Sequence, residues 1–192
     1  MISLIVGLGN PGKEHEGDRH NAGADFVTLL AQANKAILKT EKKYFGTAGK
    51  IQIDNKDIHL LIPTTYMNLS GKAITALCTF YKIAPENILV CHDELDFSPG
   101  DIRLKKGGGH GGHNGLRDTI SALGNNNGFL RLRIGIGHPG DAAQVADYVL
   151  KSPSKSERKL IEQSFEKGLA VMDMIIKGET EKAMYVLHSK HA

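Results

Sequence analysis

The sequence predicts an α/β fold, a three-layer sandwich whose central mixed, mostly parallel sheet is flanked by helices. Short apolar runs rich in branched side chains, typical of buried strands, alternate with segments whose apolar residues recur every three or four positions, as in helices. No internal repeat or linker divides the 192 residues, a length that one hydrophobic core can serve. We therefore expect a single domain over residues 1–192, with C-terminal helices from about residue 154.

Four apolar runs are expected to form buried strands, and they lie at residues 2–7, 58–62, 87–91 and 130–136. Segments 46–53 and 101–105 are expected to form edge strands. In sheets of this kind, ligands bind beyond the carboxyl ends of the strands. This rule selects the segments that follow predicted strands, which are 8–21, 63–70, 92–96 and 106–115.

Helices are expected between the strands. Asn21 is a candidate N-cap for a helix with apolar residues through Ile37, and Ser70 for a helix with apolar residues through Tyr81. A third helix should begin near Asn114 and end at Gly124.

The C-terminal part of the chain is expected to be helical. A helix is predicted over residues 141–150. Ser154 and Glu157 form an S-x-x-E capping box that opens a long helix through Ile176, and a short helix follows from about Glu179.

The composition excludes several classes of protein. With 41% hydrophobic and 23% charged residues, it is close to that of a soluble globular protein and unlike disordered, collagen-like or coiled-coil chains. Cys78 and Cys91 lack metal-ligand spacing and form no disulfide framework. The apolar stretch Leu4–Leu8 is too short to span a membrane, and no basic segment precedes it. We expect a cytoplasmic protein without a membrane partner.

The basic residues are concentrated in one part of the chain. Residues 100–133 hold six Lys or Arg against two Asp or Glu, although the whole chain carries a net charge of only +3. This stretch either binds a polyanion such as a phosphate backbone or forms a solvated basic face. The six residues are Arg103, Lys105, Lys106, Arg117, Arg131 and Arg133.

The first selected segment is glycine-rich. Gly7, Gly9 and Gly12 match the dinucleotide pattern G-x-G-x-x-G, but Pro11 interrupts it and residues 13–19 lack helical apolar spacing. Nucleotide binding is therefore disfavoured. The chemically useful side chains of this segment are Asn10, His20 and Asn21.

Residues 107–115 contain six glycines and the polar residues His110, His113 and Asn114. Such a loop can bring backbone amides close to a ligand. A metal site formed by the two histidines with Asp93 or Glu94 is an alternative. We disfavour it because the loop is a loose scaffold and no cysteine lies nearby.

The remaining segments supply acids and an amide. Asp93 follows a buried strand, where it can orient a histidine such as His20, whereas Glu94 and Asp96 are expected to be solvated. Asn68 joins Asn10 and Asn114 as neutral amides that can hold an acyl group. The set predicts a water-activating site. No G-x-S-x-G elbow favours a serine triad, since Ser70 is expected to cap a helix.

The chain closely resembles the bacterial-type peptidyl-tRNA hydrolases. The segments that carry the resemblance are GLGNPG (7–12), RHNAG (19–23), PTTYMNLSGKA (63–73), HDELD (92–96), GGGHGGHNGLRD (107–118) and RLRIGIGHPG (131–140). It implies a monomeric α/β enzyme that hydrolyses the ester between a peptide and the 3′ ribose of tRNA, without metal or other cofactor.

The resemblance also implies residue roles. His20 would activate water and Asp93 would orient it. The implied substrate-binding residues are Asn10, Asn21, Tyr66, Met67, Asn68, His113 and Asn114. Contacts with tRNA phosphates are implied for Arg103, Lys105 and Arg133, which lie in the basic stretch.

Two positions depart from the family pattern, because the family usually has tyrosine at His15 and threonine at Asp18. Both flank His20, so the loop geometry or substrate stacking there can differ. Two other functions stay open: a non-catalytic RNA-binding module of the same fold, and a metal-dependent esterase.

Overall fold

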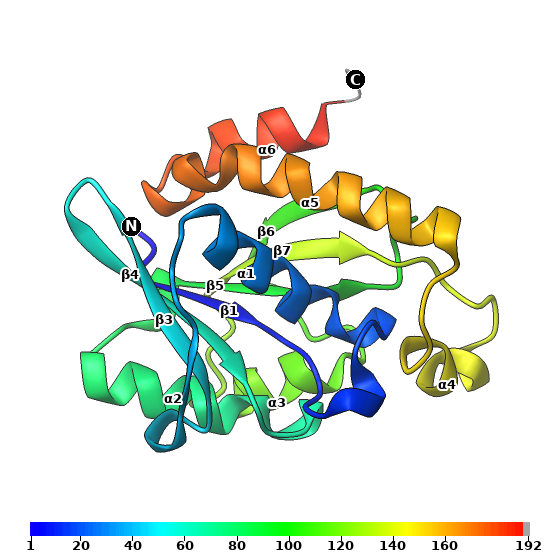
Figure 1. Ribbon diagram of the computed structural model, residues 1–192, viewed down its shortest axis with the longest axis horizontal. Helices are drawn as coiled ribbons and strands as arrows, with labels where there is room; N and C mark the ends of the chain where they lie inside the picture. Colours follow the sequence, from blue (N-terminus) through cyan, green and yellow to red (C-terminus); the bar gives the residue numbers. More distant parts are fainter. Residues whose placement is uncertain (190–192) are drawn as a thin grey trace.

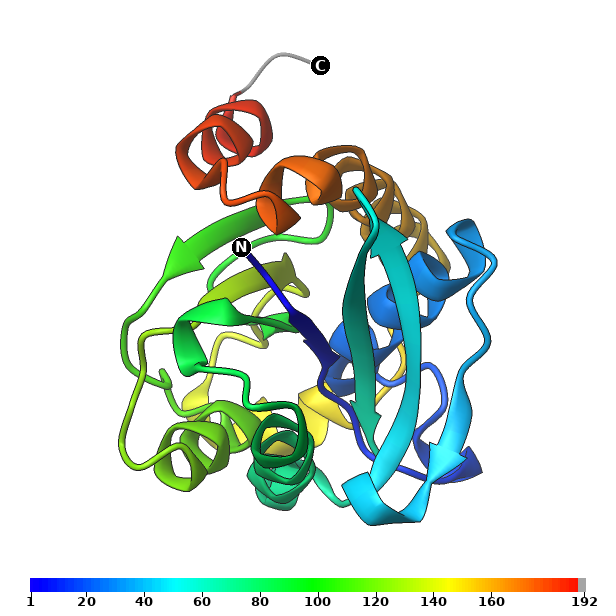
Figure 2. The same ribbon diagram turned by 90° about the vertical axis from the view of Figure 1, so that its left-hand side faces the viewer.

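The computed structural model describes residues 1–189 and has the predicted three layers (Figure 1). One seven-stranded sheet has the order β2-β3-β4-β1-β5-β7-β6, and the four central strands run parallel. Helices α1, α5 and α6 cover one face of the sheet, and α2 and α3 cover the other (Figures 1 and 2). The fold class predicted from the sequence is therefore confirmed.

The predicted strands are present, but one is misplaced in the sheet order. The strands are β1 (Leu4–Gly7), β2 (Lys39–Glu41), β3 (Gly46–Ile53), β4 (Lys56–Pro63), β5 (Ile88–Glu94), β6 (Ile102–Lys106) and β7 (Leu130–Gly135). Strand β6 is an edge strand as predicted, whereas the prediction for β3 is wrong because β2 pairs with its outer side. The sequence could not reveal β2, whose three residues have no apolar pattern.

The helices also lie where their patterns predict. They are α1 (Ala22–Ala33), α2 (Ser70–Tyr81), α3 (Asn114–Ala122), α4 (Val145–Val149), α5 (Lys155–Ile176) and α6 (Thr180–His188). Both hydrogen bonds of the capping box at Ser154 and Glu157 are formed. No helix within residues 1–189 is long and apolar enough to cross a membrane.

Two capping predictions are wrong. Asn21 precedes α1, but its side chain bonds the backbone of Asn10 instead of an amide of the helix. Ser70 is the first residue of α2, and its hydroxyl donates to the carbonyl of Met67. The apolar faces also end earlier than expected, since Ile37 and Tyr81 are exposed.

Close packing of α1 against the sheet sets the place of the loop before it. A Cβ atom on Gly23 would collide with the carbonyl oxygen of Cys91, and one on Gly7 would lie 2.5 Å from the carbonyl oxygen of Gly23. These glycines therefore allow the start of α1 to touch the carboxyl ends of β1 and β5. Part of the G-x-G-x-x-G match thus serves helix packing.

The glycine-rich loop reaches the same end of the sheet by an unexpected route. Strand β6 is antiparallel to β7, so its carboxyl end lies at the opposite end of the sheet from that of β5. The prediction that segment 106–115 starts at the same end of the sheet as the segment after β5 is therefore wrong. The loop runs back along the sheet to His113, and the buried Arg131 of β7 holds it by donating to the carbonyls of Gly108 and Gly109.

Candidate active site

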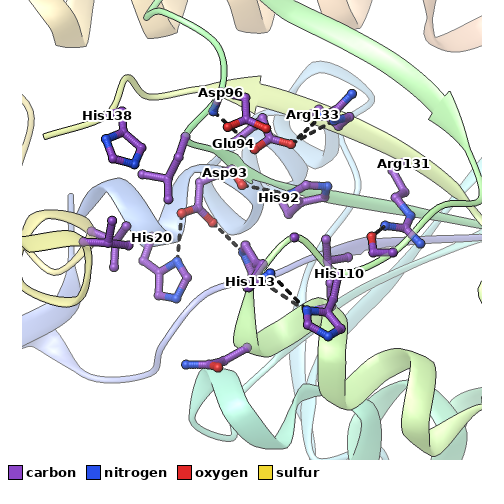
Figure 3. Close-up of a pocket in the computed structure, with 18 of the residues that line it drawn as sticks. His20, His92, Asp93, Glu94, Asp96, His110, His113, Arg131, Arg133 and His138 are labelled. Carbon is purple, nitrogen blue, oxygen red and sulfur yellow. Dashed lines mark hydrogen bonds and ion pairs between the residues drawn. The ribbon is translucent and has the colours of Figure 1, made fainter. Parts of the chain in front are cut away.

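Three side chains from distant parts of the sequence meet at the carboxyl end of β5. Asp93 ends the buried part of this strand, His20 lies in the short turn before α1, and His113 immediately precedes α3. The Oδ2 atom of Asp93 lies 2.8 Å from Nδ1 of His20, and its Oδ1 atom lies 2.8 Å from Nε2 of His113. The structure thus brings together His20 and Asp93 as the sequence predicts, and adds a second histidine to the same carboxylate (Figure 3).

The helix after His113 determines which nitrogen of that ring carries the proton. Its Nδ1 atom accepts hydrogen bonds from the backbone amides of Gly115 and Leu116, at 3.1 and 3.2 Å, and so caps α3. A nitrogen that accepts carries no proton, so Nε2 is protonated and donates to Asp93. Both nitrogens of His113 are therefore occupied.

His20 is bound to the carboxylate through one nitrogen only. Its Nδ1–H donates to Asp93, and within the described residues Nε2 has no partner. Burial lowers the pKa of His20, but the charge of Asp93 and the hydrogen bond to it prevail, so that the pKa lies above its ordinary value. Burial by itself raises the pKa of Asp93, yet the two histidines hold this pKa well below its usual range. The pair thus consists of an ionised acid and a histidine with a free, basic nitrogen.

A third histidine, His92, supports the backbone of Asp93. His92 is buried and donates from Nδ1 to the backbone carbonyl of Asp93 at 2.8 Å. Burial, with a contribution from His113, lowers the pKa of His92 to about 3. His92 therefore stays neutral and helps to hold the backbone of Asp93 in place.

The same three side chains could in principle hold a metal ion. Within residues 1–189, donor atoms of His20, Asp93 and His113 lie within 4.8 Å of one another. However, the helix cap places a proton on the Nε2 atom of His113, so this nitrogen has no lone pair for a metal. His110 lies outside the group, so the described residues do not assemble the alternative site of His110 and His113. The donor set therefore does not fit a metal.

A cleft of about 710 Å³ opens over the three residues. On one side it is lined by apolar residues of α4 and the turn before it, and on the other side by cationic residues of β6 and β7 (Figure 3). The apolar side consists of Ala142, Val145, Ala146 and Val149; the cationic side consists of Lys105, Arg131 and Arg133. We call these parts the apolar wall and the cationic end.

The cationic end contains Glu94, an acid for which the sequence predicts a solvated position. Glu94 lines the cleft, and its Oε1 atom accepts from Nε and Nη2 of Arg133 at 2.9 and 2.8 Å. That prediction is wrong because the register places Glu94 beside the end of β7. Arg103 lies outside the cleft lining and pairs with Asp101, whereas Asp96 is exposed as predicted.

The predicted amides occupy different positions around the site. Asn114 lines the cleft, and its Oδ1 atom accepts from Arg117, which leaves its NH₂ group free to donate. Outside the lining, Asn10 accepts from the backbone amide of Met67 at 2.7 Å and is bonded twice to Asn21. Tyr66 and Asn68 are exposed beside these residues, and their roles stay predictions. We call Asn10, Asn21, Met67 and Asn68 the amide cluster.

The two departures from the family pattern contact each other. Nδ1 of His15 lies 3.0 Å from Oδ2 of Asp18, and Asp18 is buried just before His20. Arg19, also buried, ties the same loop to the C-terminal part of the chain. Its guanidinium donates to the backbone carbonyl of Tyr148 at 3.0 Å and lies over the aromatic ring of the same residue.

The sequence indicated no site role for Arg19, His92 or the apolar wall, and it indicated Arg131 only as a member of the basic stretch. Arg131 offers the clearest signal in retrospect, because an arginine inside an apolar strand needs buried partners. The apolar wall offers none, since small apolar residues on a short helix are also typical of the core.

Comparisons with known proteins identify the family of the chain. A sequence profile described as peptidyl-tRNA hydrolase matches residues 4–192. The peptidyl-tRNA hydrolase of Marinomonas sp. (strain MWYL1) is 57% identical over 97% of this chain and 96% of its own length. That of Pseudomonas putida (strain KT2440) is 54% identical over 100% of this chain and 98% of its own length.

Solved structures give the same result. The crystal structure of peptidyl-tRNA hydrolase from Acinetobacter baumannii is similar with a TM-score of 0.94 and 47% sequence identity. The similarity covers 98% of this chain and 95% of that one. With a profile that matches nearly the whole chain and relatives above half identity, the protein belongs to the peptidyl-tRNA hydrolase family.

Proposed function

We propose that this protein hydrolyses peptidyl-tRNA at the ester between the peptide and the 3′ ribose. The family supports this reaction, and the hydrogen bond between His20 and Asp93 is the observation that carries the mechanism. A buried, ionised carboxylate behind a histidine whose second nitrogen is free is an arrangement suited to general-base catalysis.

In the proposed first step, Nε2 of His20 takes a proton from a water molecule while the water oxygen attacks the ester carbonyl carbon. Asp93 stabilises the imidazolium that forms. The tetrahedral intermediate then collapses, the bond from carbon to the ribose oxygen breaks, and the imidazolium returns its proton to that oxygen. The products are an N-blocked peptide and tRNA with a free 3′ end, and His20 is again neutral.

His113 acts in this proposal as a positioning residue. Since both of its nitrogens are already bonded, it has no free lone pair with which to take a proton from water. Its hydrogen bond to Asp93 keeps the carboxylate turned toward His20. The family resemblance implies substrate binding for His113, whereas its hydrogen bonds favour this positioning role.

The substrate is held around the three residues. The free NH₂ group of Asn114 is suited to donate to the ester carbonyl, where negative charge develops. Asn10 and Asn68 of the amide cluster are suited to the peptide backbone. Lys105 and Arg133 are suited to phosphates of the tRNA, which would be contacted without reading of bases. We also propose that the enzyme is a cytoplasmic monomer, in line with its substrate.

The decisive test compares N-acetylaminoacyl-tRNA with the same tRNA carrying a free amino group, in the presence of a chelator. We expect the wild-type protein to cleave only the blocked substrate, and His20→Ala to lower kcat by about 10²–10⁴-fold, the usual range for loss of a general base. Circular dichroism checks that the variant is folded. Tyr185→Ala, at an exposed position of α6, is the matched control.

The two alternatives predict other results. A non-catalytic RNA-binding module would bind tRNA and cleave neither substrate. A metal-dependent esterase would lose its activity in the chelator and regain it when metal is added back.

A further inference from the structure

Exposed apolar side chains are concentrated beside the amide cluster. Of the eleven large hydrophobic residues exposed within residues 1–189, five lie on α2, in the turn before it or in the adjacent loop. We call these five residues the aromatic track: Phe45, Tyr66, Leu69, Phe80 and Tyr81. Tyr66 and Phe80 are 59% and 61% exposed. Apolar surface gathered in this way is typical of interaction sites.

The side chains of the track are grouped along α2, and those near its C-terminal end contact one another. The rings of Phe80 and Tyr81 lie 4.9 Å apart, and the ring of Tyr44 lies 5.8 and 6.0 Å from them. Phe45 follows Tyr44 in the chain and contacts Lys72 on α2. Leu69 and Phe80 are eleven residues apart, which is close to three helical turns and places both on one side of α2.

One end of this surface adjoins the proposed site. Tyr66 and Leu69 flank Met67 and Asn68, and the backbone amide of Met67 is bonded to Asn10 at 2.7 Å. The other end lies at the C-terminal end of α2. The track therefore begins at the group suited to the peptide backbone and leads away from it.

The track and the cationic end lie on different sides of the molecule. Helix α2 contacts β4 and the turn at Lys42–Tyr44, whereas the cationic end belongs to β6 and β7 at the other edge of the sheet. Figure 1 shows α2 below the sheet and β6 in the upper part of the sheet. RNA bound at the cationic end and a chain following the track would thus leave the site in different directions.

We propose that the aromatic track binds the peptide of peptidyl-tRNA through apolar side chains several residues away from the ester. The proposal rests on the proposed function and extends it to the part of the substrate that varies most. Exposed aromatic rings offer large contact area without demanding one particular partner, as recognition of many peptides requires.

The surface suits a peptide better than RNA. Nζ of Lys43 lies 4.9 Å from the ring centre of Phe80, and Nζ of Lys72 lies 4.3 Å from that of Phe45. Each lysine covers one face of its ring, which reduces the area on which a base could stack. Apolar peptide side chains need only the ring edges and the aliphatic parts of these lysines.

The dimensions set the peptide length at which the track matters. Eleven residues of α-helix separate Leu69 from Phe80, or about 17 Å at 1.5 Å per residue. An extended peptide covers about 3.3 Å per residue, so roughly five residues reach Phe80. A single blocked amino acid does not reach beyond the amide cluster.

The test uses two hexapeptidyl-tRNAs with the same tRNA and the same residue at the ester. One peptide carries Leu and Phe in its distal half, and the other carries Ser and Gly there. Amide-linked analogues that are not cleaved report binding. We expect the wild-type protein to bind the apolar peptide about threefold to tenfold more tightly, from partial burial of one or two apolar side chains.

Variants test whether the preference for the apolar peptide depends on the aromatic track. Phe80→Ser combined with Tyr81→Ser should abolish this preference, and Tyr185→Ser, at a still more exposed aromatic on α6, should keep it. Equal binding of the two peptides by the wild-type protein would overturn the proposal. The proposal would also be overturned if the double variant weakened the binding of deacylated tRNA as much as that of both peptidyl-tRNA analogues, because the surface would then bind RNA. Cleavage of N-acetylaminoacyl-tRNA tests the proposed function separately.

Discussion

Two loops deliver a histidine to opposite oxygens of Asp93, and they are built differently. The loop with His20 is tied down along its length: Arg19 donates to Tyr148 and Lys151, and the backbone of Gly17 accepts from Arg158. In the loop before His113, a Cβ atom on Gly109, Gly111 or Gly112 would meet nothing within 4 Å. That loop is fixed at its two ends, by Arg131 and by the cap on α3.

The difference explains how two equal side chains acquire unequal roles. The helix cap occupies one nitrogen of His113 and Asp93 the other, whereas only one nitrogen of His20 is bonded. A general base needs a free lone pair directed at its substrate. In the proposed mechanism, His20 on the firmly held loop therefore acts as the base, and His113 on the open loop orients the carboxylate.

Replacing the carboxylate of Asp93, which both histidines share, should have the largest effect on kcat. We expect Asp93→Asn to lower kcat by about 10²–10⁴-fold, since it leaves His20 without its orienting charge. The charge of Asp93 raises the pKa of His20, and wild-type activity should fall as the pH drops through that raised pKa. Without the charge, burial lowers the pKa, so the acid limb of kcat/KM should move to lower pH. An unshifted limb would contradict the coupling of the two groups.

Variants of His113 separate its two contacts. His113→Ala loses both the cap and the hydrogen bond to Asp93, so kcat should fall about tenfold and the free energy of unfolding by about 1 kcal/mol. His113→Asn keeps a good N-cap residue, and should recover the stability but not kcat. Urea denaturation and steady-state kinetics measure the two effects. Recovery of kcat by Asn would show that His113 acts only as a cap.

The hydrogen bonds of Arg19, which hold the loop with His20 and which we call the clamp, should matter less for kcat. Arg19→Met removes the guanidinium that donates to the carbonyls of Tyr148 and Lys151, which should lower the free energy of unfolding by about 1–3 kcal/mol. We expect kcat to fall about threefold to tenfold, because His20 follows directly in the chain. Arg158→Met, which loosens Gly17 instead, is the control. If the variant loses the expected stability but keeps its kcat, the contacts of Arg19 serve only folding.

The smallest effect is expected at the cationic end. Glu94→Gln removes the charge that pairs with Arg133, so tRNA should bind a few-fold more tightly and with a steeper dependence on salt. Filter binding of deacylated tRNA at several salt concentrations measures both. Weaker binding would show that Glu94 is needed to place Arg133, and an unchanged slope would count against Arg133 as a phosphate contact.

Much of the fold could be predicted from local patterns. The apolar runs predicted four central strands, and the capping box located the start of α5, because both signals depend on neighbouring residues. Strand β2 has no such pattern. The position of β3 and the direction of β6 depend on pairing between distant segments, which no local signal reports.

The candidate site divides in the same way. Strand-end position alone indicated His20 and Asp93, although 73 residues separate them. The partner of Glu94, the clamp at Arg19 and the second contact of Asp93 had no counterpart in the sequence. Each is a contact between side chains whose distance is determined by strand register and helix placement.

By itself, the sequence determined most of the strands and helices and the family to which the chain belongs, and it indicated the residues to which we assign the chemistry. Only the tertiary structure decided which histidine keeps a free nitrogen, which acid neutralises the cationic end and where apolar surface stays exposed beside the site. Residue types and spacing set what each group is able to do. Its protonation and its partners depend on the donors and acceptors that folding brings within about 3 Å.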